Sequence, residues 1–488
     1  MARGDLISAR AVAADVLHRF DPARDYAGPI LDRRLNQTQE RQRATDLVYG
    51  TIRNLTAIDA VIEALAGRPI ARITPRLRSI IRIAVYELAY SPATPVYSIV
   101  DEAVKNTGKA GGRKQTGFVN AVLRQIVRHI MDREVTLAQA DPRRTLIQSP
   151  ERGCTLDTDF LPDPAVSLPA YLSTCFSLPA WLIDEWLAEF GPEQTRQICF
   201  ACNRRPSLYI RINSLRTTAE ALLARFEEAG VQAERAAGPL GPLSPLGPLP
   251  PLDSKGREGP KGRKGPSWSP EMIRLTGPHA VTQLPGFTEG LFSVQDLAAS
   301  QAVRILAPQP GWSILDLCAA PGTKTTQLAE ATRDAAHVTA TDIDPERLER
   351  VRENLTRLGL KSVTILAYAQ LEEVEAGSFD AILLDVPCSN TGVLARRVEA
   401  RFRVKPKAVK DIAAIQKGLL ERAASLVKPG GRIGYSTCSI QRQENQYVVH
   451  GFLAANCEFE LLREELLLPS AEPPDHDGAY VALLTRKS

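Results

Sequence analysis

Two cysteines near the C-terminal end of the chain follow short apolar runs and are placed where they could do chemistry. Cys388 lies in Asp385-Val-Pro-Cys-Ser, and Cys438 lies in Ser436-Thr-Cys-Ser. The preceding runs are typical of buried strands, and in open α/β sheets ligands bind at the carboxyl ends of such strands. A single cysteine is more often a small buried hydrophobe. Two of them on loops of one sheet favour a functional pair.

The stretch Ser313 to Gln327, SILDLCAAPGTKTTQ, predicts a strand, a loop of small residues and the start of a helix. Pro321 and Gly322 turn the chain between strand and helix. Such a turn lets backbone N–H groups and a helix dipole approach a bound ligand. The spacing is neither the GxGxxG pattern nor a phosphate-binding P-loop. Taken by itself the stretch is also compatible with an ordinary strand-to-helix turn.

Asp342 ends the next predicted strand, about twenty residues after the turn, where a carboxylate suits the two hydroxyls of a ribose. The alternative role for a carboxylate here is to cap the following helix. That role fits Asp344 better, because Asp344 directly precedes Pro345. Asp342 is therefore a candidate ligand-binding residue.

The composition indicates a soluble, cytoplasmic protein of two or three domains. The chain has 488 residues, of which 44% are hydrophobic and 24% charged. We expect no membrane span and no signal peptide. The eight cysteines are scattered, which does not suggest disulfides. Cys199 and Cys202 form a CxxC without a second one, so we expect no metal site.

Charge is distributed unevenly along the chain. Residues 1–150 hold 23 Lys and Arg against 15 Asp and Glu, whereas the net charge of the whole chain is +4. A basic N-terminal third indicates a nucleic-acid partner. A solvated basic face without a partner is the alternative.

The apolar spacing predicts four regions. Residues 1–135 read as successive amphipathic helices and predict an all-α domain. Residues 136–168 are polar and Pro-rich and predict a linker. Residues 169–290 predict a small α+β module with a Pro/Gly-rich insertion at 238–270. Residues 291–488 alternate strands and helices, which predicts an α/β domain with an open parallel sheet.

Several sequence stretches resemble known families. AVYELAY, SIVDEAVK and GFVNAVLR, the last with Asn120 and Arg124, resemble the NusB-like RNA-binding bundle. CAAPGTKT, DVPCSNTG and YSTCS resemble the signature loops of S-adenosylmethionine-dependent RNA cytosine-5 methyltransferases. Together they resemble the Sun/Fmu group, which modifies 16S ribosomal RNA. The resemblance implies a Rossmann-like methyltransferase domain, S-adenosylmethionine as cofactor and RNA as partner. We also expect a monomer.

The resemblance also implies roles for individual residues. Cys438 would be the nucleophile, and Cys388 would help to expel the enzyme from the product. Asp385 would hydrogen-bond the target base and border the cofactor, and Asp342 would bind the cofactor ribose. The residues that would hold the methionine part of the cofactor are Cys318, Ala319, Ala320, Pro321, Gly322, Thr323 and Lys324.

The implied chemistry has a physical reason. Cytosine C5 is too weak a nucleophile to take a methyl group directly, but a thiolate that adds to C6 makes C5 nucleophilic. A carboxyl group near N3 stabilises this adduct if it carries or shares a proton. After methyl transfer H5 is removed and the thiol is eliminated, and a second thiol suits that step. The base must be unstacked for both faces to be reached.

The chain departs from the family pattern at three places. Thr323 stands where a second Gly is usual, Tyr368 stands near the usual adenine-binding Asp, and RRVEARFRV replaces a His-Pro-Asp run. We expect adenine binding to rest on stacking or on Glu372. Two alternatives stay open: the same chemistry on transfer RNA, and a non-catalytic RNA-binding assembly factor with a degraded cofactor site.

Overall fold

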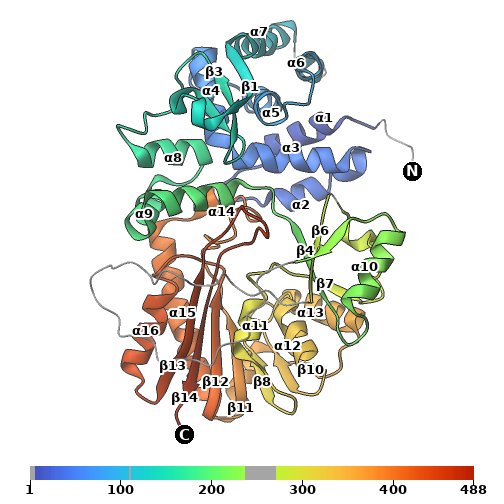
Figure 1. Ribbon diagram of the computed structural model, residues 1–488, viewed down its shortest axis with the longest axis vertical. Coiled ribbons are helices and arrows are strands. Elements are labelled where there is room, and N and C mark those ends of the chain that lie inside the picture. The colour runs from blue at the N-terminus through green and yellow to red at the C-terminus, as the bar shows by residue number, and fades with distance from the viewer. Residues whose placement is uncertain (1–5, 109–111, 237–270, 278) are drawn as a thin grey trace. The chain divides into compact units, whose positions relative to one another are not determined.

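The computed structural model describes residues 6–108, 112–236, 271–277 and 279–488 (Figure 1). The chain divides into two compact units. Unit one consists of residues 1–205 together with 394–405, and unit two consists of residues 206–393 together with 406–488. The predicted Pro/Gly-rich insertion at 238–270 lies outside the described residues.

Helices dominate unit one, as the apolar spacing predicts. Their buried faces form two adjoining clusters, in which α5 supplies Ile80, Ile81 and Leu88 to one and Ile83 to the other. The helices of this unit are α1 (Ala9–Arg19), α2 (Ala27–Asp32), α3 (Arg41–Arg53), α4 (Leu55–Ala66), α5 (Pro75–Tyr90), α6 (Val96–Gly108), α7 (Arg113–His129), α8 (Leu168–Phe176), α9 (Ala180–Asn203) and α14 (Ala400–Arg403).

The prediction of an all-α domain followed by a linker is wrong in one part. The strands β1 (Ile130–Thr136), β2 (Thr145–Ile147) and β3 (Arg152–Leu156) form an antiparallel sheet within unit one. The apolar residues Leu146 and Cys154 pack into the helical core. Polar residues surround these few apolar positions in the sequence, and this hid the strands. The helices α8 and α9 also belong to unit one rather than to the following module.

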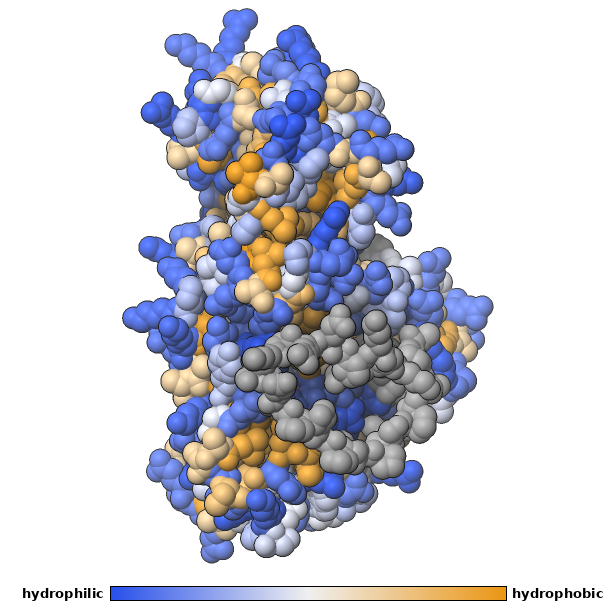
Figure 2. All heavy atoms as spheres, turned by 60° about the vertical axis from the view of Figure 1, so that its left-hand side comes forward, coloured by the Kyte–Doolittle hydropathy of each residue, from blue (hydrophilic) through white to orange (hydrophobic). Residues whose placement is uncertain are grey.

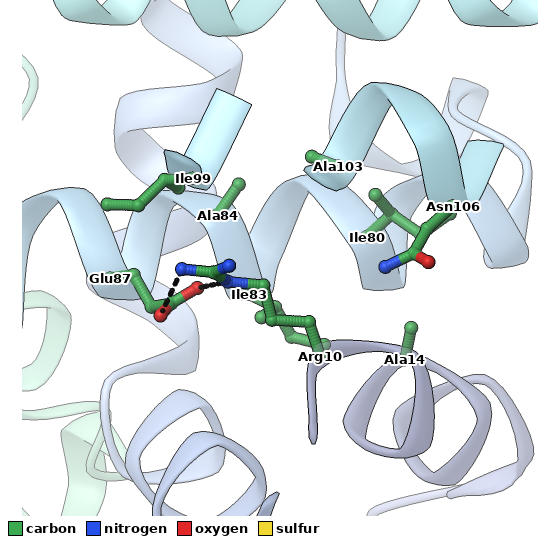
Figure 3. Close-up of a pocket in the computed structure, with 9 residues that line it drawn as sticks. All are labelled: Arg10, Ala14, Ile80, Ile83, Ala84, Glu87, Ile99, Ala103 and Asn106. Atoms are coloured by element: carbon green, nitrogen blue, oxygen red, sulfur yellow. Dashed lines mark hydrogen bonds and ion pairs between the residues drawn. The ribbon is translucent and has the colours of Figure 1, made fainter. Parts of the chain in front are cut away.

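An ion-pair network centred on the buried Glu87 joins three helices of unit one. Arg10 of α1 donates from Nη2 to Glu87 Oε1 of α5 at 3.0 Å, and Arg43 of α3 donates to the same oxygen at 3.0 Å. Figure 3 shows Arg10 and Glu87 facing each other beside a cavity of about 10 Å³, lined by apolar residues such as Ile80 and Ile99. This volume is at the lower limit for a single water molecule. The cavity is therefore a packing feature and not a ligand site.

The segment Leu394–Lys405 is integrated into unit one by Arg401, which is 1% exposed. Arg401 Nη1 donates to the carbonyl oxygens of Arg53 and Phe176 and to Asn203 Oδ1, at 2.8, 3.0 and 2.8 Å. Nη2 donates to the carbonyl oxygen of Cys202 at 2.9 Å. Burial lowers the pKa of Arg401 to about 10. The RRVEARFRV stretch that departs from the family pattern is thus a structural part of the N-terminal unit.

Unit two begins with a small antiparallel sheet in the order β5-β6-β4-β7, covered by one helix. Its core contains Ile210, Phe226 and Phe292. The elements are β4 (Leu208–Ile212), α10 (Ala219–Glu228), β5 (Ala233–Arg235), β6 (Met272–Leu275) and β7 (Phe292–Val294). The prediction of a small α+β module is confirmed for these elements.

The second part of unit two is a sheet in the order β10-β9-β8-β11-β12-β14-β13. The first five strands in this order run parallel, as predicted, and β14 is antiparallel to both of its neighbours. The strands are β8 (Ser313–Asp316), β9 (His337–Ala340), β10 (Val363–Ile365), β11 (Phe379–Asp385), β12 (Val427–Thr437), β13 (Phe459–Leu467) and β14 (Ala479–Arg486). The helices are α11 (Gln301–Leu306), α12 (Thr323–Ala331), α13 (Pro345–Leu358), α15 (Pro406–Leu426) and α16 (Gln446–Ala455).

Hydrophilic side chains cover most of the face that Figure 2 shows, with smaller apolar areas between them. Within the described ranges, every helix is too short or too polar to cross a membrane.

The role of Arg401 gives a test of how unit one is built. Arg401→Lys keeps the charge, but a single ammonium group cannot reach the carbonyl groups that the planar guanidinium satisfies. We expect the free energy of unfolding of unit one to fall by about 2–4 kcal/mol, because buried acceptors lose their donors. Denaturant unfolding of this variant, compared with Arg397→Lys at an exposed site of the same segment, measures the effect. Equal stability of the two variants would contradict the assignment.

Candidate active site

The register of the parallel strands brings the candidate residues to one edge of the sheet. Asp316 at the end of β8 pairs with Ala340 of β9 and with Leu383 of β11. Asp385 at the end of β11 pairs with Ser436 of β12. The loops that follow β8, β9, β11 and β12 therefore leave the sheet side by side, as the sequence pattern predicts.

The two cysteines predicted to act together are in contact. Cys388 Sγ lies 2.9 Å from Cys438 Sγ, and Cys438 Sγ lies 3.4 Å from Asn390 Oδ1. Both residues are free thiols with intermediate exposure. The hydrogen bond with Cys438, together with burial, raises the pKa of Cys388 well above its ordinary value. Cys388 is thus held as a neutral thiol that can exchange a proton with the group beside it.

An ion pair adjoins the thiols. Lys324 Nζ lies 2.6 Å from Asp385 Oδ2, and Ser436 Oγ donates to Asp385 Oδ1 at 2.9 Å. Burial would lower the pKa of Lys324, but the charge of Asp385 and its hydrogen bond outweigh burial and raise it. A cavity of about 40 Å³ is lined by Lys324, Asp385 and Cys438 together. A cation, a carboxylate and a thiol thus meet at one small opening.

The loop before α12 has the geometry that the sequence predicts. Gly322 has a φ of +100°, and a Cβ there would lie 3.2 Å from Val351 Cα, so glycine is required. Thr323 begins α12 and has no positive φ. The replacement of the family's second Gly by Thr323 therefore strains nothing in the backbone. The first N–H groups of α12 have no partner within the helix and project outward beyond its N-terminal end, toward the loop.

Asp342 is 5% exposed and faces this loop. Its Oδ2 accepts from Ala320 N and its Oδ1 accepts from Asp344 N, both at 3.1 Å. A carboxylate oxygen has a second acceptor site, so both oxygens can still accept from a diol. Asp344 caps α13 through hydrogen bonds from Glu346 N and Arg347 N, which confirms the capping assignment.

The exposed side chain of Ile343 lies directly after Asp342 in the sequence and is 79% exposed. Its apolar surface is free to contact a flat ring. Tyr368, by contrast, is half-buried and packs on the core of the sheet, while Glu372 is exposed. Stacking on Tyr368 or bonding to Glu372 stays a prediction.

Asp316 was not singled out from the sequence, because a carboxylate at the end of an apolar run also fits a structural role. It is fully buried, and its Oδ2 accepts from Thr325 Oγ1 at 2.7 Å. Its Oδ1 has no hydrogen-bond partner among the described residues. Burial raises the pKa of Asp316 to about 7. A buried oxygen without a donor, beside the loop that precedes α12, is suited to a cationic or N–H group of a ligand.

Arg211 of β4 links the small module to the loop and was also missed. It is buried, and its Nε and Nη2 donate to the two oxygens of Glu330 at 2.9 and 3.1 Å. Its Nη1 donates to the carbonyl oxygen of Thr323 at 3.1 Å. The module therefore holds the first residue of α12 in place. The alternating strand SLYIRIN gave no sign that its Arg would point inward.

Three further cysteines lie outside the thiol pair, and the cofactor-binding role of Cys318 stays a prediction. Cys318 lies in the loop, and burial raises its pKa, so its thiol stays protonated. Cys199 and Cys202 are buried in α9. Within the described residues there is no group of three or more His, Cys, Asp or Glu residues that could hold a metal ion.

Three family models match successive parts of this chain. A sequence model described as 16S rRNA methyltransferase RsmB/F matches residues 303–477. A NusB family model matches residues 7–128, and a ferredoxin-like domain model of RsmF/B-like methyltransferases matches residues 178–240.

Individual relatives match over most of the chain. A probable ribosomal RNA small subunit methyltransferase B from Synechocystis sp. is 31% identical, over 92% of this chain and 89% of the relative. A ribosomal RNA small subunit methyltransferase B from Vibrio cholerae is 30% identical, over 99% of each chain. The crystal structure of the protein PH0851 is 24% identical with a TM-score of 0.71, over 98% of this chain and 99% of the other, which supports the fold.

Asp316 makes stability depend on pH in a defined direction. With its pKa raised from 3.8 to about 7, the folded chain keeps a proton that the unfolded chain releases, so stability falls as pH rises through this range. Asp316→Asn removes the effect. We expect the free energy of unfolding of this variant to equal that of the wild type at pH 4. At pH 8 it should exceed the wild-type value by as much as about 4 kcal/mol. Unfolding at several pH values, with the exposed Asp411→Asn as control, measures it. A difference that does not change with pH would contradict this.

Proposed function

Because the chain belongs to the RsmB/F family of 16S rRNA methyltransferases, we propose that it methylates C5 of a cytosine in 16S ribosomal RNA. The proposed reaction passes through a covalent bond between Cys438 Sγ and C6 of the base. The observation that carries the proposal is the 2.9 Å contact between Cys388 and Cys438 beside the Lys324–Asp385 ion pair. The names of the relatives support ribosomal RNA of the small subunit as the substrate.

The cofactor is S-adenosylmethionine, and the site fits it. Asp342 retains acceptor capacity for the ribose hydroxyls, and the loop with the N-terminus of α12 offers N–H donors for the methionine carboxylate. The unpartnered oxygen of Asp316 would accept from the ammonium group. Ile343 would contact the adenine ring. When bound, this group supplies an electrophilic methyl group.

The residues of the chain carry the other steps. Cys438 as thiolate forms a bond to C6, and the electron pair of the C5–C6 double bond becomes available at C5. Asp385, in its protonated form or sharing a proton with N3, stabilises the charge that moves into the ring. Lys324, whose Nζ lies 2.6 Å from Asp385 Oδ2, orients this carboxyl group toward the base through the ion pair.

Release of the product needs a second group. Once C5 carries the methyl group, H5 leaves as a proton to a water molecule, its electron pair re-forms the C5–C6 double bond, and the C6–S bond breaks so that Cys438 leaves as a thiolate. Cys388 is in contact with that sulfur and is held neutral. It is therefore placed to deliver a proton to the departing thiolate. A chain that only bound RNA would have no need for two thiols in contact, which favours catalysis over the assembly-factor alternative.

Replacement of each cysteine separates the two roles. Cys438→Ala should abolish methyl transfer to undermodified 16S ribosomal RNA, because no bond to C6 can form. Cys388→Ala should accumulate a covalent protein–RNA complex that survives denaturing gels, because elimination is blocked. Methyl transfer from labelled S-adenosylmethionine measures the first effect, and the shifted band measures the second.

The exposed thiol of Cys457 provides the matched control. Cys457→Ala should behave as wild type. Full activity of Cys438→Ala would refute the assignment of the nucleophile. If the wild-type protein methylates transfer RNA but not ribosomal RNA, the proposed substrate is wrong and transfer RNA replaces it.

The cofactor site has a control two residues away. Asp342→Ala should weaken S-adenosylmethionine binding at least about tenfold, because a charged acceptor of the ribose hydroxyls is lost. Asp344→Ala removes a carboxylate from the same loop. It also removes the N-cap of α13, which lowers the free energy of unfolding by about 1 kcal/mol. It should leave the affinity almost unchanged. Titration calorimetry on both variants decides, and equal losses of affinity would count against the ribose assignment.

A further inference from the structure

A fully buried carboxylate, Glu444, joins the two cysteine loops. It lies just before α16. Its Oε1 accepts from the backbone N–H of Ser389 at 2.7 Å, and its Oε2 accepts from the Ser439 hydroxyl at 2.6 Å. The Ser389 hydroxyl also donates to Oε2. Gln416 Nε2 of α15 donates to Oε1 at 3.3 Å.

The residues that Glu444 binds are the immediate neighbours of the two thiols. Ser389 follows Cys388, and Ser439 follows Cys438. One carboxylate therefore contacts both loops, one residue away from each cysteine. Because its two oxygens are fixed relative to each other, it also fixes the separation of the two loops.

The neighbouring residue Asn445 completes the connection on the Cys438 side. Its Oδ1 accepts from Thr437 Oγ1 at 2.7 Å, and its Nδ2 donates to the carbonyl oxygen of Ser439 at 2.9 Å. Cys438 thus lies between two residues that are both anchored to Asn445.

A backbone hydrogen bond also ties the two loops together. The N–H of Gly392 donates to the Cys438 carbonyl oxygen at 2.9 Å. A Cβ at Gly392 would lie 2.8 Å from that oxygen, so the close approach of the two loops requires glycine. No side chain takes part in this bond, and it therefore remains when Glu444 is changed. The contribution of Glu444 can be measured against that constant background.

A carboxylate in this position is costly, so its hydrogen bonds must be made. Burial raises the pKa of Glu444, although the hydrogen bonds from Ser389 and Ser439 oppose this. An ionised group without water is tolerated only where donors surround it. The donors here come from both cysteine loops and from α15. Any movement of one loop away from the other would therefore cost this buried carboxylate at least one of its hydrogen bonds.

We propose that Glu444 is a positioning residue that holds the Cys388 and Cys438 thiols in contact. It acts through Ser389 and Ser439 and touches neither sulfur. The positioning of the two thiols by Glu444 is argued from contacts within the protein alone. Its effect on the rate of methyl transfer rests on the proposed function.

The first experiment measures thiol proximity without any RNA. Phenylarsine oxide bridges two thiols that lie close together, and peptide mapping by mass spectrometry locates the bridge. The wild type should be bridged between Cys388 and Cys438, and either cysteine-to-alanine variant should not be. In Glu444→Gln the bridging at this pair should slow at least about tenfold. Glu464→Gln is the matched control, because Glu464 is a carboxylate of the same unit that binds Tyr480 and His450.

The second experiment measures the reaction. Glu444→Gln should lower kcat for methyl transfer at least about tenfold, since a displacement of about 1 Å can cost about 100-fold in rate. The affinity for S-adenosylmethionine should stay as in wild type, because Asp342 and the residues before α12 lie on the loops after β9 and β8 and not on the two loops that Glu444 binds. In a Cys388→Ala background, the same change should slow formation of the covalent protein–RNA band. Glu464→Gln should keep the wild-type kcat.

The outcomes are distinct. Slower bridging and lower kcat with unchanged cofactor binding support the proposal. Wild-type bridging in Glu444→Gln overturns it, whatever the activity. A wild type that methylates no cytosine, but shows bridging that depends on Glu444, refutes the proposed function and leaves the positioning role standing. If Glu444→Gln does not fold, Ser439→Ala removes one donor of the same network, and wild-type bridging in that variant overturns the proposal.

Discussion

The alignment of the parallel strands is the constraint on which the site depends. With Asp316, Ala340 and Leu383 in register, and Asp385 opposite Ser436, the loops that carry chemistry must emerge together. If the pairing register of one strand slipped by one residue, every side chain of that strand would point to the opposite face of the sheet. The sheet thus supplies the positions, and the loops supply the groups.

The sheet alone does not bring two sulfur atoms into contact. The loops after β11 and β12 are irregular, and their path is set by the hydrogen bonds around Glu444 and by the bond from Gly392 to Cys438. On the side proposed for the cofactor, Arg211 binds Glu330 and the carbonyl oxygen of Thr323 at the start of α12, while Asp342 accepts from Ala320 N. Buried charges therefore support both halves of the site. Such charges are stable only when fully paired, which gives each loop a single arrangement.

Much of this could be predicted from the sequence because the relevant signals are local. The strand–loop–helix pattern around Gly322, the cap at Asp344 and the alternation of strands and helices depend on neighbouring residues. The loop motifs around Cys388 and Cys438 identified the thiols before their contact was known. The small module was predicted for the same reason.

Other features depend on contacts between distant segments: Arg211 and Glu330 are 119 positions apart, and Arg401 reaches Asn203 across 198 positions. No periodicity marks such residues as buried. The short strands at 130–156 were missed because their few apolar residues lie among polar ones, and Glu444 could not be distinguished from a surface carboxylate until its partners were seen.

The most direct test of the central claim is a map of 5-methylcytosine in 16S ribosomal RNA from cells with and without this protein. Bisulfite sequencing, with mass spectrometry of the digested RNA, identifies both the position and the methylated atom. We predict that one or a few cytosines lose a C5 methyl group when the protein is absent and regain it with the wild type but not with Cys438→Ala. An unchanged 5-methylcytosine map in 16S ribosomal RNA, or the loss of a methyl group from another atom, would contradict the account.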